Sequence, residues 1–70
     1  MIYEIIRTKN NEISRKTVIS GSAHEVKSIA GKEFQADPGL GHIQVLEEGY
    51  TILMLQKDTQ TGKMIQRFSA

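Results

Sequence analysis

The residue types that most often perform catalysis or bind metals are few in this sequence and are not grouped. The chain has two histidines, His24 and His42, and no cysteine. These histidines have no recognisable metal-ligand spacing, so we interpret them as ordinary surface or strand residues. Glu47 and Glu48 are adjacent, and neighbours on a strand point to opposite faces, which does not suit paired-carboxylate chemistry. With no local serine, histidine and acid arrangement either, the sequence predicts no enzyme, no cofactor and no metal site.

Two glycine-containing segments resemble phosphate-binding motifs without completing them. Residues 39–44 begin like G-x-G-x-x-G, but the final glycine is missing and the segment follows a predicted helix instead of a strand. Residues 61–64 resemble the end of a P-loop, but they lack the upstream glycine and have Met64 where Ser or Thr is needed. We therefore reject both as nucleotide sites.

Length and composition indicate one small domain over residues 1–70. Without cysteines, without a signal-peptide pattern and with no long apolar run, the simplest interpretation is a cytoplasmic protein. The net charge is only +1, but it is segregated along the chain. Residues 1–32 have six bases and three acids (+3), residues 33–56 have four acids (−4), and residues 57–70 have three bases and one acid (+2). This pattern predicts a basic and an acidic region.

A single amphipathic helix, predicted over residues 22–35, organises the chain. Ser22 followed by Glu25 is a capping-box pattern, and Pro38 with Gly39 ends the helix. Its apolar stripe consists of Ala23, Val26, Ala30 and Phe34, with Ile29 flanking it.

The opposite side of this helix is the candidate partner-binding surface. Gly31 lies between Lys27 and Lys32, which predicts a low spot flanked by two ammonium groups that could dock an anionic partner. An ordinary solvated helix face with a tolerated glycine is the alternative. The predicted surface consists of His24, Lys27, Ser28, Gly31, Lys32 and Gln35.

Five strands are predicted around the helix, in the order β-β-α-β-β-β. Their ranges are residues 2–8, 13–19, 42–47, 50–57 and 63–68, and the first and fourth have apolar residues on both faces, which favours interior positions. The pair Arg15 and Lys16 favours an edge position for the second strand. The short links predict an α+β domain, an antiparallel sheet with one helix on one face. The other face must be partly polar or meet a partner, so a homodimer is open.

The first strand and the helix resemble small phage-encoded type I-F anti-CRISPR proteins. The resemblance lies in residues 3–7, Tyr-Glu-Ile-Ile-Arg, and in residues 26–34, Val-Lys-Ser-Ile-Ala-Gly-Lys-Glu-Phe. It implies an inhibitor without catalysis, which docks on the crRNA-guided surveillance complex and blocks target DNA access. The implied partner contacts are Lys27 and Lys32, with Arg7 from the first strand.

Two other functions stay open from the residues alone. A small nucleic-acid-binding regulator would contact phosphates through Arg15, Lys16, Lys27 and Lys32. A structural or assembly protein would dimerise through the uncovered sheet face. No membrane partner is predicted.

Overall fold

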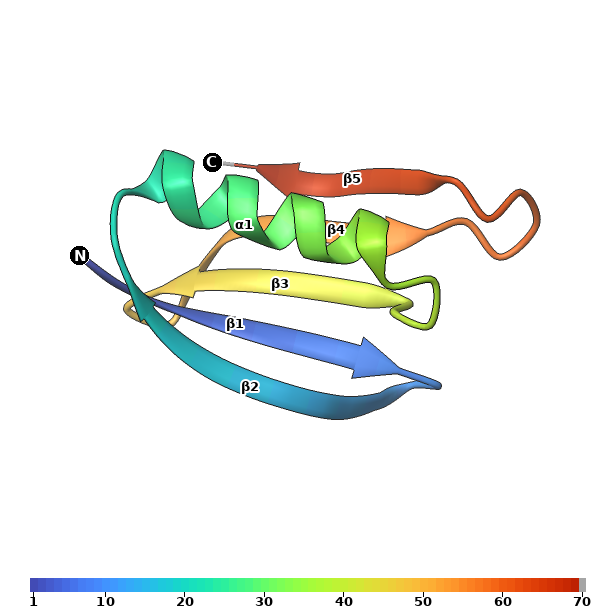
Figure 1. Ribbon diagram of the computed structural model, residues 1–70, viewed down its shortest axis with the longest axis horizontal. Helices are drawn as coiled ribbons and strands as arrows, with labels where there is room; N and C mark the ends of the chain where they lie inside the picture. The colour runs from blue at the N-terminus through green and yellow to red at the C-terminus, as the bar shows by residue number, and fades with distance from the viewer. Residues whose placement is uncertain (70) are drawn as a thin grey trace.

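The computed structural model describes residues 1–69 and confirms the predicted order of elements (Figure 1). One helix packs on one side of a five-stranded antiparallel sheet. Each element lies within about two residues of its prediction. The elements are β1 (Ile2–Lys9), β2 (Glu12–Ser20), α1 (Ala23–Ala36), β3 (His42–Glu47), β4 (Tyr50–Lys57) and β5 (Met64–Ser69).

The strand order across the sheet is β2-β1-β3-β4-β5. Three short turns join β1 to β2, β3 to β4 and β4 to β5, while the helix carries the chain from β2 across β1 to β3. As predicted, β1 and β4 each have a neighbour on both sides, and β2 is an edge strand. The β1–β2 turn is made by Asn10 and Asn11, which both adopt positive φ (52° and 65°).

The predicted cap begins the helix. The Ser22 hydroxyl accepts a hydrogen bond from the Glu25 backbone N–H at 3.2 Å and donates to the Glu25 carboxylate at 3.0 Å. At the other end, the Asp37 N–H donates to the Glu33 carbonyl, and the Asp37 carboxylate accepts from the Gly39 N–H at 2.9 Å. Side chains from the sequence therefore fix both ends of α1.

The core lies between α1 and the sheet. The helix contributes Val26, Ala30 and Phe34, which are all fully buried, and the predicted stripe is confirmed at these positions. Ile29, which flanks the stripe in the sequence pattern, is instead exposed. The sheet residues packed in the same core are Tyr3 and Ile5 of β1, Ile43 and Val45 of β3, and Ile52, Leu53 and Leu55 of β4.

The opposite side of the sheet has no element of the described chain over it, and we call it the open face (Figure 1). In β1, Tyr3, Ile5 and Arg7 are buried under α1, whereas Ile2 and Ile6 alternate with them and point to the open face. The prediction that one helix leaves the other face of the sheet uncovered is therefore confirmed for residues 1–69. Its apolar residues, placed by strand register, are Ile2, Ile6, Ile13, Val18, Leu46, Met54, Ile65 and Phe68.

Candidate functional site: the α1–β5 groove

The structure divides the predicted helix surface into two parts. His24, Lys27, Ser28 and Gly31 line a groove of about 270 Å³ between α1 and the strands β4 and β5. Lys32 and Gln35 are exposed and are not among the residues that line this groove. Four of the predicted residues thus form one wall of a groove. The other two lie on the solvent-exposed side of the helix, which we call its upper side.

The groove exists because α1 is centred on the middle strand, β3, and is too narrow to cover the edge strand β5. The helix packs mainly on β3 and β4, which leaves β5 beside it instead of beneath it. Leu53, Leu55 and Met64 supply apolar side chains inside the groove, and Gln66 and Ser69 of β5 supply polar ones. We call this site the α1–β5 groove.

Gly31 helps to keep this groove open. A Cβ atom built at Gly31 meets no atom within 4 Å, so the position has room for a side chain that the sequence does not supply. The low spot predicted between Lys27 and Lys32 is therefore present, but it faces the β5 side of the helix.

Lys27 is less exposed than the sequence pattern predicts. Its side chain is half-buried, and Nζ donates a hydrogen bond to the Ser69 hydroxyl at 3.3 Å. Lys27 is therefore partly exposed, because this side of the helix is turned toward β5. Its ammonium group lies at the rim of the groove and carries positive charge there.

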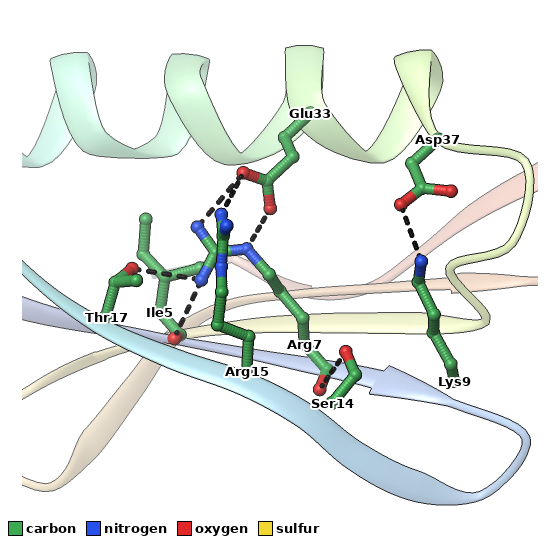
Figure 2. A network of polar contacts seen from close by, with 8 residues as sticks. All are labelled: Ile5, Arg7, Lys9, Ser14, Arg15, Thr17, Glu33 and Asp37. Carbon is green, nitrogen blue, oxygen red and sulfur yellow. Dashed lines mark hydrogen bonds and ion pairs between the residues drawn. The ribbon is translucent and has the colours of Figure 1, made fainter.

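Arg7 lies inside the molecule and not on a partner-binding surface. Its exposed fraction is 6%. Figure 2 shows its guanidinium held between the helix and β2, where it pairs with both carboxylate oxygens of Glu33 and donates to the Thr17 hydroxyl at 2.9 Å. A fourth hydrogen bond runs from Nη1 to the Ile5 carbonyl at 3.4 Å. The prediction that Arg7 contacts a partner is therefore corrected: it fastens α1 to the sheet.

The four bases considered for phosphate contact do not form one surface. Arg15 and Lys16 are neighbours on β2 and point to opposite sides of the sheet. Arg15 reaches Glu33 at 3.4 Å on the helix side, while Lys16 is on the open face. Lys27 lies at the α1–β5 groove, on the flank of the helix opposite Glu33. A continuous basic path for a phosphate backbone is thus not assembled by these residues.

The open face is a second surface region of interest, because several of its apolar side chains are exposed. Val18 and Ile2 are 71% and 65% exposed, and with Leu46 and Glu4 they line a hollow of about 520 Å³ at one end of this face. The sequence predicts that one face is uncovered, but these residues are not among the predicted site residues. The signal was the parity of β1, where Ile2 and Ile6 alternate with the buried residues.

No group of three or more potential metal ligands occurs among residues 1–69. His42 lies on the open face next to Thr8 and Gln56, and partial burial lowers its pKa from the ordinary value of 6.5. Over the same residues, no helix is long and apolar enough to cross a membrane.

Comparison with known proteins gives no family model, curated protein or solved structure that matches this chain significantly. The groove and the open face are therefore interpreted from their own residues.

Proposed function

We propose that this chain is a non-catalytic binding protein whose α1–β5 groove receives part of a protein partner. One observation carries this proposal: four of the six predicted helix residues line the groove together with an apolar floor. Lys27 and His24 stand beside that floor, and Met64 within it is 44% exposed. An apolar side chain next to a carboxylate or carbonyl oxygen is the chemistry that fits.

The size of the groove limits what it can contribute to affinity. A volume of about 270 Å³ holds one or two side chains, and burying one side chain the size of leucine contributes about 1.5–3 kcal/mol. Specific protein interfaces need a larger contact, so the partner must also touch the exposed upper side of α1 at Lys32 and Gln35. A folded protein surface fits this requirement better than a small ligand.

The resemblance of β1 and α1 to type I-F anti-CRISPR proteins supplies the candidate partner. On that basis the chain is a phage-type inhibitor, and the partner is the crRNA-guided surveillance complex, whose access to target DNA the bound inhibitor blocks. Because the groove and the adjoining helix surface carry Lys27 and Lys32, they are suited to acidic or polar groups on a protein subunit. These side chains are positively charged, so this surface does not imitate the negative charge of DNA.

The test measures binding of a fluorescent target duplex by a purified type I-F surveillance complex as the protein is added. We expect duplex binding to fall and to level off near a simple molar ratio of protein to complex. Unchanged duplex binding at saturating protein would contradict the assignment of this partner.

Two tryptophan variants locate the contact. Gly31→Trp fills the groove, and the open space around this position allows the side chain without displacing the core. Ala36→Trp places the same side chain at an exposed position that is not among the groove residues. We expect the first variant to lose inhibition and the second to keep it. Equal inhibition by both variants would remove the groove from the proposal.

A further inference from the structure

The side chains of the open face are arranged so that two copies of this face can complement each other. Two rows of side chains cross all five strands on this face, because the strand registers align one residue from each strand. The first row is Lys16, Ile6, Gln44, Met54 and Phe68, in the order β2-β1-β3-β4-β5. The second row, in the same strand order, is Ile13, Thr8, His42, Gln56 and Ile65.

A second copy can pack on this face if the two copies are related by a two-fold axis that lies in the face and runs along β3. Each row of one copy then lies over the same row of the other copy, in reverse strand order. With that axis, β3 faces β3, β1 faces β4, and β2 faces β5 of a second copy. In the first row, Ile6 then meets Met54, and Lys16 meets the ring of Phe68. In the second row, Ile13 meets Ile65, and Thr8 meets Gln56. Apolar side chains thus face apolar ones, and the cation faces an aromatic ring.

The other two-fold axis in the plane of the face gives a worse match. An axis across the strands places β2 over β2, so both Lys16 ammonium groups lie at the same edge of the interface, and they meet directly where the axis passes through the first row. The axis along β3 separates these charges to opposite sides of the interface. Since packed sheets cross at about 30°, the row pairing is closest at the central strands and loosens toward β2 and β5.

The area of the face is sufficient for a weak to moderate dimer. Five strands about 4.8 Å apart and six residues of about 3.3 Å each give a flat footprint of about 480 Å² per copy. Two copies therefore enclose about 1,000 Å² before the relief of the side chains is added, which reaches the lower limit for specific interfaces.

From this self-complementarity we propose that the chain forms a homodimer in which two open faces pack together around a two-fold axis along β3. This interface goes beyond the proposed function, because it lies on the side of the sheet away from the α1–β5 groove. Each copy keeps its groove and its helix exposed in the dimer.

The first test is the mass of the protein by sedimentation equilibrium, from micromolar to millimolar concentration. We expect the mass to rise from 7.9 kDa toward twice that value. A mass that stays at 7.9 kDa across this range would overturn the proposal.

A charge exchange tests the arrangement of the two copies. Phe68→Lys places a second ammonium opposite Lys16 of the other copy, and we expect dimerisation to weaken about tenfold or more. Adding Lys16→Glu to that variant gives an opposite-charge pair at the same contact and should restore most of the affinity. Lys16 and Phe68 lie on the two edge strands of one sheet, about 19 Å apart at four strand spacings, so recovery reports contact between copies.

Ile29→Lys is the matched control. Ile29 is 43% exposed and Phe68 is 46% exposed, but Ile29 lies on the helix, away from the open face. We expect this variant to dimerise like the wild type, and circular dichroism should show that all three variants fold. A double variant that stays monomeric, or an Ile29→Lys variant that loses the dimer equally, would overturn the proposed packing.

Discussion

The two faces of the sheet are formed by the same strands, but only one of them is covered by another element of the described chain. On the side of α1, the core side chains from the sheet and the helix are almost fully buried. Each of the three nitrogens of the buried Arg7 guanidinium donates a hydrogen bond. On the open face, apolar side chains alternate with polar ones, and Val18 and Phe68 remain exposed. The covered face therefore accounts for stability, and the open face is available for association. The difference follows from a single helix covering one side of five strands.

The largest predicted effect compares the two phenylalanines on these faces. Phe34 is fully buried against the sheet, and the Lys57 ammonium lies 5.2 Å from its ring centre. Phe34→Ala should lower the free energy of unfolding by about 3–5 kcal/mol, because it opens a cavity in the core. A domain of this size has about 4–10 kcal/mol in total, so this single change removes a large fraction of its stability. Urea denaturation followed by circular dichroism measures the change.

Phe68→Ala is the matched variant on the open face. In dilute solution, where the chain is monomeric, its free energy of unfolding should stay within about 1 kcal/mol of the wild type. Similar losses for Phe34→Ala and Phe68→Ala would break the distinction between the two faces.

A second prediction concerns the ion pair that fastens α1 to the sheet. Glu33→Ala leaves the buried Arg7 guanidinium without its carboxylate and should cost about 2–4 kcal/mol, somewhat less than for a fully buried pair because the Glu33 side chain is 28% exposed. The combined variant Arg7→Met with Glu33→Leu should recover most of this loss, since no unpaired charge remains. A double-mutant cycle in urea measures the coupling.

The Lys9–Asp37 pair, also drawn in Figure 2, is the control for that measurement. Its atoms are 3.1 Å apart, but both side chains are well exposed, so Lys9→Ala should cost less than about 1 kcal/mol. If Lys9→Ala proved as costly as Glu33→Ala, burial would not be the reason for the importance of Arg7.

The smallest predicted effect is a pH dependence located on the open face. Burial lowers the pKa of His42 below its ordinary value of 6.5, so the unfolded chain takes up this proton more readily than the folded one. The contribution of His42 to stability is therefore complete above about pH 6.5 and is lost as the pH falls below that value. His42→Gln should flatten the stability curve in this window.

Acid titration of Asp37 falls in a separate window. Hydrogen bonds from Lys9 and the Gly39 N–H hold the pKa of Asp37 below its ordinary value of 3.8, so its contribution is lost only at lower pH. Thermal unfolding of wild type and His42→Gln between pH 7.5 and pH 3 separates the two. An unchanged slope just below pH 6.5 in His42→Gln would show that the open face does not shield this histidine.

Most of the fold could be predicted from the sequence because its signals are local. The Ser22 cap, the helical stripe ending at Phe34 and the alternation in β1 depend on neighbours a few residues apart. Even the edge position of β2 is visible in Arg15 and Lys16. These signals agree with one another, and the structure agrees with them.

The site was predicted less well because its geometry depends on contacts distant in sequence. A helical projection shows that Lys27 and Gly31 lie away from the core stripe, but it does not show which strands α1 packs on. The helix packs on β3 and β4, and this placement turns the flank with Lys27 and Gly31 toward β5 and makes a groove. Likewise, the parity of β1 places Arg7 under the helix, but its partner Glu33 is 26 residues away. The sequence contains no local pattern that predicts an ion pair between Arg7 and Glu33.

Methionine methyl groups allow one measurement that tests the separation of the two surfaces directly. Of the three methionines, Met64 lines the α1–β5 groove and Met54 lies in the middle of the open face. Protein labelled with 13C at the methionine methyls would be titrated with unlabelled surveillance complex at low concentration, and separately with itself. We predict that the complex shifts or broadens the Met64 resonance and that self-titration shifts the Met54 resonance. A complex that perturbs Met54 and leaves Met64 unchanged would contradict docking through the α1–β5 groove.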